Sequence, residues 1–482
     1  MLTENAYGDS RLSLWLRVRE FAVPLSMIET ATARRRAGDW AGACAAAGVD
    51  VDLRLRSVAR VHGWELAARV RADLRRLAPD LLRWHMPRVA PDGLLRPGLT
   101  VALARYDVAG DGGESPVRLV ARTPPAWADA GQRISLALWD GMVPGPSRYP
   151  HPHPDRRFRL DLHRHLWDAG RSDELRVRSG ADRPSAEDRP VSGTEPRGHH
   201  PYAVDRWAAE AAILLRAERG PTSAAAGAVA VRLGSRDRLV LDLSAGPDGA
   251  GPPTLRISAA RPGDGPPASS LPLLPDAATW VPPDLELFRA GLIGADRLHP
   301  LVASALVPDH SPSGSGRPPD GVGRPHLVEC RGARHRIGLV DGVLVPLDHK
   351  PDEIRREELL VALTGTPLPC LQAIDVAHRQ PDCLPGVRER LDHGDTVGAL
   401  AVVENLLGPE ALLRGGDLLD ALEAAAARRV TYGLFRAGLI GCGPGSEPVP
   451  VPGAGAEQVR PARRTAADRK LRRRRAHPRH AM

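Results

Sequence analysis

Lysine is nearly missing from this chain of 482 residues: only Lys350 and Lys470 stand among its 66 basic residues, a skew typical of a genome rich in G and C. A phosphate-binding P-loop needs a lysine followed by serine or threonine, whereas Pro351 and Leu471 follow these two lysines. The glycine-rich loop and Val-Ala-Ile-Lys segment of a protein kinase are absent as well. An enzyme that forms a Schiff base would have to use Lys350, because Lys470 lies in a run of arginines.

Cysteine is also scarce. An odd number of five cysteines, without any Cys-x-x-Cys spacing, excludes a disulfide framework and favours a reducing compartment. They are Cys44, Cys330, Cys370, Cys383 and Cys442. The first residues lack the pattern of an export signal, and no apolar run approaches the 18 residues that a membrane span needs. We therefore expect a soluble, cytoplasmic protein that does not enter the membrane.

Familiar catalytic motifs are absent too. The chain has no Gly-x-Ser-x-Gly nucleophile elbow and no His-Glu-x-x-His metal motif. Its most glycine-rich loop, residues 441–445, follows an expected helix and not a strand, so it does not predict a dinucleotide site. The sequence thus gives no candidate catalytic residue and no cofactor, and it favours a protein without enzymatic activity.

Positive charge is concentrated at the C-terminus. Residues 460–482 contain ten cations and one acid, so the other 459 residues sum to −1 although the whole chain carries +8. The densest run is Arg472, Arg473, Arg474 and Arg475. These residues could neutralise phosphates and bind nucleic acid or another polyanion without sequence preference, since no aromatic residue is nearby for base stacking. The alternative is a solvated, disordered extension.

Hydrophobic periodicity predicts an α+β protein with a helical N-terminal unit, an antiparallel β-rich middle, a helical C-terminal unit and a disordered basic tail. Glycine and proline together number 95, which predicts linkers between the folded units. The expected divisions are a helical unit at 1–95, a β-rich unit at 96–180, a linker at 181–200, an α+β unit with a β-hairpin at 201–307, a linker at 308–325, a β-hairpin plus helical bundle at 326–441 and the tail at 442–482.

Apolar residues recur at three- and four-residue steps through most of residues 9–90, which predicts helices. Short alternating segments then predict strands at 100–103, 117–120, 133–138 and 158–162. A helix at 204–219 precedes a hairpin of 229–233 and 238–243, with a third strand near 255–257. A further hairpin is expected at 326–347, turning near Gly332 and again near Asp341. All nine tryptophans lie at or before Trp280, so the C-terminal core should be aliphatic.

Two short segments repeat within the chain. Residues 287–294 and 434–441 are identical over eight positions, Leu-Phe-Arg-Ala-Gly-Leu-Ile-Gly, and both are typical of helix ends that stop at a left-handed glycine. They are interpreted as similar core-facing helix ends or, alternatively, as a duplicated docking element. A second echo, in which Gly precedes Asp39, Asp395 and Asp417, predicts aspartates that cap helices. It resembles a helical hairpin of the tetratricopeptide type, but the copies are not in tandem.

Histidines cluster at residues 151–165. On a strand, His163 and His165 would point to the same side, and with Asp155 or Asp161 they would form a candidate metal site. The alternative is a solvent-facing polar strand.

A second group comprises Cys370, His378, Cys383 and His393. Its cysteines lie thirteen residues apart, whereas zinc knuckles place ligands two to four residues apart. Buried free cysteines acting as small hydrophobic residues are therefore the preferred interpretation.

These observations lead to one main functional hypothesis, a non-enzymatic cytoplasmic interaction or scaffold component that binds an unknown protein partner. The missing catalytic motifs and the helical units motivate it. The first alternative is a metal-dependent enzyme built on His163 and His165. The second is a non-specific nucleic-acid-binding protein that uses its arginine-rich tail.

Overall fold

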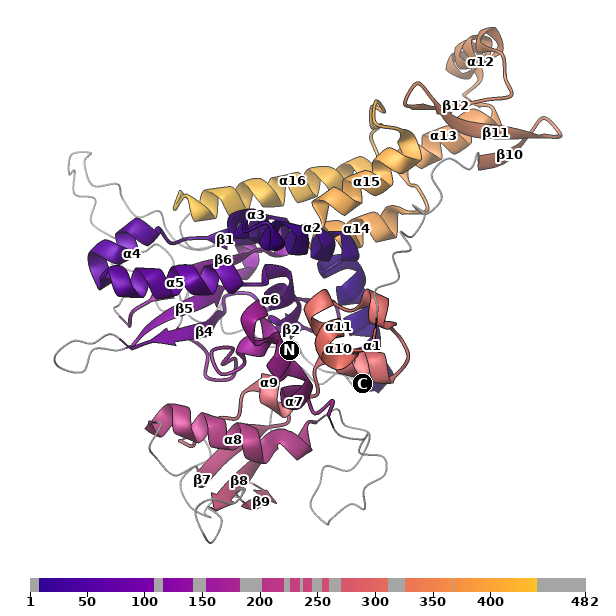
Figure 1. Ribbon diagram of the computed structural model, residues 1–482. Coiled ribbons are helices and arrows are strands. Elements are labelled where there is room, and N and C mark those ends of the chain that lie inside the picture. Colours follow the sequence, from indigo (N-terminus) through magenta and orange to yellow (C-terminus); the bar gives the residue numbers. More distant parts are fainter. Residues whose placement is uncertain are drawn as a thin grey trace, which may run out of the picture. The chain divides into compact units, whose positions relative to one another are not determined.

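The computed structural model describes residues 8–107, 116–141, 153–182, 202–220, 226–234, 237–244, 254–259, 270–310, 326–365 and 367–439. Within this part the chain is an α+β protein, as the sequence predicts, with helices toward both ends and mainly antiparallel sheets between them (Figure 1). The predicted basic tail lies outside the described residues. No helix in the described ranges is both long and apolar enough to cross a bilayer.

The predicted N-terminal helices are confirmed. They are α1 (Gly8–Arg17), the short π-helix η1 (Val18–Ala22), α2 (Leu25–Arg36), α3 (Trp40–Ala46), α4 (Leu55–His62), α5 (Trp64–Arg76) and α6 (Pro79–His85). Proline is well placed at the start of α6, because the first helical residue has no intrahelical partner for its N–H. All seven residues of α6 are buried, so this short helix is a central support for the elements around it.

A mixed sheet packs with these helices. Its strand order is β1 (Val49–Val51), β6 (Ile134–Trp139), β5 (Val117–Arg122), β4 (Thr100–Tyr106), and the latter three are antiparallel and confirm the prediction. The sequence did not predict β1, a three-residue strand parallel to β6. Along the chain, α6 is followed by a two-stranded ribbon, β2 (Arg88–Val89) and β3 (Leu94–Leu95), and then by β4.

The strand predicted at residues 158–162 is wrong. Phe158 and Leu160 are both buried, which produces the alternation in the sequence. The backbone nevertheless turns on itself, because the amides of Leu162 and His163 donate to the carbonyls of Arg159 and Leu160. A single bridge joins Arg159 to β4. Short helices follow: η4 (Arg164–Leu166), η5 (Ala169–Glu174) and α7 (Leu175–Ser179).

One hydrophobic core joins the N-terminal helices to the mixed sheet. Trp15 and Trp84, whose ring centroids are 5.2 Å apart, lie fully buried in it. Residues much later in the chain, from α10 (Pro283–Arg289) and α11 (Pro300–Leu306), complete the same core. Short connecting helices accompany them: η2 (Ala126–Ala128), η3 (Ala130–Gln132), α9 (Asp276–Thr279) and η7 (Ala295–Arg297).

A second core belongs to the predicted α+β segment. Helix α8 (Val204–Arg219) packs on the antiparallel sheet β7 (Gly227–Arg232), β8 (Arg238–Ser244) and β9 (Thr254–Ala259) (Figure 1). The hairpin and the third strand are therefore confirmed. Trp207 anchors this core, and its indole nitrogen donates to the carbonyl of Thr279.

The C-terminal part begins with a three-stranded antiparallel sheet, β10 (His326–Cys330), β11 (Ala333–Val340) and β12 (Val343–Pro346). Its turns lie at Arg331-Gly332 and Asp341-Gly342, as predicted. Five helices follow: α12 (Pro351–Thr364), α13 (Pro369–Arg379), α14 (Leu384–Asp392), α15 (Thr396–Leu407) and α16 (Asp417–Arg436). The buried cluster shared by α14–α16 consists of Leu, Val and Ala, which confirms the expected, mainly aliphatic composition. Tyr432 of α16 is also buried but is not part of this cluster.

Both copies of the eight-residue repeat end helices in the same way. Helix α10 stops at Gly291 and helix α16 at Gly438, each with φ of +67°. In each copy the sixth residue's amide donates to the first residue's carbonyl, Leu292 to Leu287 and Leu439 to Leu434. This is the glycine stop that the repeat predicts. The first copy buries Leu287 in the main core, whereas its counterpart in the second copy, Leu434, is half-buried. At the sixth position, Leu292 and Leu439 are both exposed.

Two of the three predicted aspartate caps are confirmed. Asp39 accepts a hydrogen bond from the Gly42 amide at the start of α3, and Asp395 accepts one from Gly398 at the start of α15. The third prediction is wrong, because Asp417 is already the first residue of α16 and Gly416 occupies the cap position.

Candidate metal centre

Four metal-binding side chains converge in the C-terminal part of the chain. They are Cys330, His335, His349 and Cys370, and one donor atom from each lies within 4.8 Å of all the others. Cys330 ends β10, His335 lies on β11, His349 follows β12, and Cys370 lies in the first turn of α13. Two thiols and two imidazoles are a ligand set that zinc takes in structural sites.

The hairpin register explains why Cys330 and His335 share a face. Arg331 and Gly332 both have positive φ, the pattern of the tight two-residue turn that suits a hairpin. Cys330 is therefore paired directly with Ala333 across the ladder. His335 lies two residues farther along β11, so its side chain points to the same side as those of Ala333 and Cys330.

The two imidazoles point their nitrogens at each other. Nδ1 of His335 lies 2.7 Å from Nε2 of His349, and the ring centroids are 4.4 Å apart. The other nitrogen of His349, Nδ1, lies 3.4 Å from a carboxylate oxygen of Glu353. A carboxylate behind a histidine ligand is the usual arrangement at metal sites, because it fixes the ring and leaves Nε2 free to bind the ion. Arg331 in turn donates to Glu353 over 2.9 Å.

The two cysteines are fully buried. Burial, together with the neighbouring Cys330 thiol, raises the pKa of Cys370 to about 11. Without a cation the Cys370 thiol stays protonated at neutral pH, whereas a bound divalent metal holds its cysteine ligands as thiolates. Two thiolates, two neutral imidazoles and one Zn²⁺ carry no net charge together, which lowers the cost of burying the group.

The distances fit an ion after a small adjustment. Zinc bonds of about 2.0–2.3 Å in a tetrahedron place the donor atoms about 3.3–3.8 Å from one another. The four donors lie within 4.8 Å of each other, while the two histidine nitrogens, at 2.7 Å, must separate slightly. Four protein ligands fill a tetrahedron, so the centre has no open position for a substrate and fits a structural role.

The hydrophobic core around this centre is small. Its buried members are Cys330, Ile337, Leu368, Cys370 and Ile374. Two of these five are the proposed thiolate ligands, so little apolar area remains to hold the three-stranded sheet against α13. Small folded units of this kind usually need a metal or a disulfide, and a bound ion would supply the missing stabilisation.

His163 and His165, the pair that the sequence proposed as a metal site, lie around η4 and not on a strand. Their ring centroids are 5.9 Å apart. His163 places Nδ1 2.9 Å from the Arg159 carbonyl and Nε2 3.2 Å from the Glu210 carboxylate, so both nitrogens face groups of the protein itself. Burial acts to raise the pKa of Glu210, but hydrogen bonds with His163 and Arg178 outweigh it and lower that pKa to about 2. Metal binding by this pair stays a prediction.

The aspartates expected beside that pair are engaged locally. Asp161 forms an ion pair with Arg159 at 2.8 Å, and Asp155 accepts the amide of Arg157. Within the described ranges, the group of three or more side chains close enough for a metal is the Cys330–Cys370 set.

The second group named from the sequence is divided between several places. Cys370 lies with Cys330, whereas Cys383 packs against the aliphatic cluster of α14–α16, as a small hydrophobic residue would. The ring of His393 stacks on Phe21, with 6.2 Å between centroids. Arg472–Arg475, the arginine run predicted to bind polyanions, lies outside the described residues.

The sequence carries one signal of this centre. Cys330 and His335 flank a predicted hairpin turn, so two residue types that bind zinc are placed close together across it. Cys370 lies forty residues beyond Cys330, so only the folded structure shows that the two belong to one site. Comparison with protein-family profiles, curated proteins and solved structures gives no match.

Proposed function

We propose that this chain is a zinc-binding, non-enzymatic interaction protein, in which the metal holds residues 326–379 together as a binding module. One observation carries the proposal: four donors of the zinc type meet in one buried place with a carboxylate behind His349. The closed ligand set supports a structural metal, not a catalytic one. The metal-dependent enzyme considered from the sequence has less support, since both ring nitrogens of His163 already face protein groups.

The surface of the module supports a protein as the partner. The outer face of its sheet carries exposed apolar side chains, with Leu327 at 59% exposure and Val340 at 45%. Helix α12 adds Leu359 and Leu363, at 66% and 84%. Exposed apolar patches of this kind typically mark protein contacts. Residues 326–379 hold seven cations and eight acids, a balance that does not favour nucleic acid.

The metal content of purified protein tests this proposal. We expect about one zinc ion per chain, because the four ligands form one tetrahedral site. Cys330→Ser and Cys370→Ser should each lose most of that zinc, since a hydroxyl does not replace a thiolate. Elemental analysis after gel filtration in metal-free buffer measures both.

Two matched variants serve as controls. Cys383→Ser changes a cysteine outside the centre, and Leu327→Asp changes the outer face of the sheet; both should keep their zinc. Full zinc in Cys330→Ser would contradict the proposal. Loss of zinc from His163→Ala together with its retention in Cys370→Ser would instead assign the metal to the histidine pair named from the sequence.

A further inference from the structure

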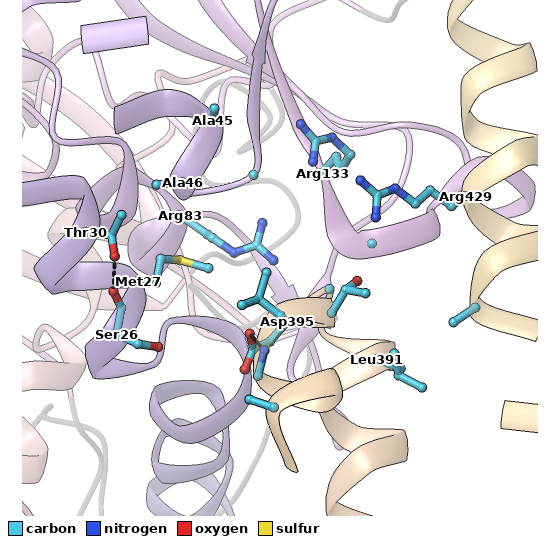
Figure 2. Close-up of a pocket in the computed structure, with 18 of the residues that line it drawn as sticks. Ser26, Met27, Thr30, Ala45, Ala46, Arg83, Arg133, Leu391, Asp395 and Arg429 are labelled. Carbon is cyan, nitrogen blue, oxygen red and sulfur yellow. Dashed lines mark hydrogen bonds between the residues drawn. The ribbon is translucent and has the colours of Figure 1, made fainter. Parts of the chain in front are cut away.

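A cavity of about 490 Å³ lies where α2 and α3 meet η3, α15 and α16 (Figure 2). Its lining combines apolar side chains, among them Met27, Leu391 and Val397, with four arginines. The arginines are Arg83, Arg133, Arg428 and Arg429. Figure 2 shows the guanidinium groups of Arg133 and Arg429 close together, beside that of Arg83.

Arg83 is the unusual member of this cluster. It is fully buried, yet its guanidinium donates only to backbone carbonyls among the described residues: those of Ala22 at 2.9 Å, Gln132 at 2.5 Å and His393 at 2.7 Å. Burial lowers the pKa of Arg83 to about 10, so it remains charged at neutral pH. A buried charge is expensive unless an opposite charge accompanies it. Three carbonyls explain how Arg83 is held but bring no carboxylate into contact with its charge.

Most other charges of the lining are paired with residues outside it. Arg133 pairs with Asp50 at 2.7 Å, and Arg428 pairs with Asp392 at 3.0 Å. Asp395, the acid of the lining, forms an ion pair with Arg390 at 2.8 Å and caps α15. Arg429 is exposed on α16. The cavity therefore presents more positive than negative charge.

The first turn of α15 adds to this positive potential. Residues 395–398 line the cavity at the N-terminal end of a twelve-residue helix. The amides of a helix N-terminus carry a partial positive charge that attracts anions; here the Asp395 cap already accepts the Gly398 amide and offsets part of that charge. Together with the buried Arg83, this end of the cavity is suited to a group with more than one negative charge.

We infer that this cavity binds a small organic phosphate. The phosphate group would lie by Arg83, Arg429 and the start of α15 and would supply the countercharge that no touching carboxylate provides. The apolar side chains of the lining, Met27, Leu391 and Val397, would contact the organic part of the molecule. A volume of about 490 Å³ exceeds what phosphate alone occupies and falls in the ordinary range for small-molecule sites. The site uses no part of the zinc centre, so it stands apart from the proposed function.

Calorimetric titration of the purified full chain tests the inference. The probes are adenosine 5′-monophosphate and glucose 6-phosphate, with inorganic phosphate, citrate and adenosine for comparison. We expect saturable binding of at least one phosphate ester, more tightly than inorganic phosphate, citrate or adenosine. Arg429→Glu should weaken that binding by about tenfold or more, because a charged hydrogen bond to phosphate becomes a repulsion.

Arg429 is the residue of choice because its side chain is exposed and its replacement should leave the fold intact, whereas Arg83→Met removes three buried hydrogen bonds. Arg355→Ala, on exposed α12, is the matched control and should bind as the unchanged chain does. The inference is overturned if neither phosphate ester binds. It is also overturned if citrate or adenosine binds equally well, or if Arg429→Glu binds with unchanged affinity.

Discussion

Removal of zinc is expected to unfold the sheet β10–β12 while the mixed sheet β4–β6 stays intact. In the proposed arrangement, the metal is the main support of a unit whose core holds five buried residues, two of them the proposed ligands. Structural zinc contributes about 10–16 kcal/mol of apparent binding free energy in small zinc-folded units. Hydrogen exchange with mass spectrometry, before and after treatment with a chelator, should show the amides of β11 exchanging about a hundredfold faster or more.

Three comparisons make that result interpretable. Amides of β5, which lie in the main core, should keep their protection throughout. Returning zinc should restore the protection of β11, whereas magnesium should not, because a site with two thiolates does not suit a hard cation. Unchanged exchange in β11 after the metal has been shown to leave would mean that the ion does not hold the module.

Replacing Asp284 with alanine is expected to cost about 3–5 kcal/mol of unfolding free energy, the usual result of breaking a buried ion pair. The Asp284 carboxylate accepts from Arg19 at 2.7 Å and from the Trp84 indole at 2.6 Å, and both charged side chains are at most 2% exposed. The Arg19 guanidinium also lies 3.8 Å from the centroid of the Trp84 ring. The alanine variant leaves the buried Arg19 cation and the Trp84 indole N–H without the carboxylate that both contact. Because native proteins hold about 5–15 kcal/mol in total, denaturant unfolding should reveal a large shift in midpoint.

A surface pair provides the matched control. Asp107→Ala breaks the pair with Arg105, whose side chains are 78% and 44% exposed, and should change stability by less than about 1 kcal/mol. The double variant Arg19→Met/Asp284→Leu should be more stable than Asp284→Ala alone, since it removes the stranded charge. Equal losses of unfolding free energy in Asp284→Ala and Asp107→Ala would contradict the prediction that the buried pair contributes more to stability than the exposed one.

The parts of the fold that could be predicted are those with a long, regular pattern. The helices of residues 9–90, the hairpin β7–β8 and the turns at Gly332 and Asp341 all follow from periodicity and turn chemistry. The strand β1 could not be predicted, because three residues carry too little pattern and it is defined by pairing with distant β6. At residues 158–162 the pattern predicted a strand that does not exist. Buried side chains alternate there, but the backbone turns instead of extending.

The metal centre divides in the same way. Cys330 and His335 could have been placed on one face from the predicted hairpin alone, because the register is fixed by a two-residue turn. His349 and Cys370 reach the site through tertiary packing, which no local spacing records. Sequence proximity instead suggested grouping Cys370 with Cys383, which the fold packs against the aliphatic cluster of α14–α16.

The arginine cavity was hidden for a related reason. Charge counting describes residues 1–459 as nearly neutral. An average over many residues does not reveal four arginines from three separate segments of the chain that line one cavity. Nearly all basic residues of this chain are arginines, so the residue type did not distinguish the four arginines of the cavity from the others. The information lies in the burial of Arg83 and in the absence of a carboxylate touching it among the described residues.

X-ray absorption at the zinc edge of the purified, full-length chain tests the central claim most directly. We expect a first shell of two sulfur atoms at about 2.3 Å and two nitrogen atoms at about 2.0–2.1 Å, contributed by Cys330, Cys370, His335 and His349. A zinc-free protein, or a first shell of oxygen and nitrogen without sulfur, would contradict the assignment of this centre.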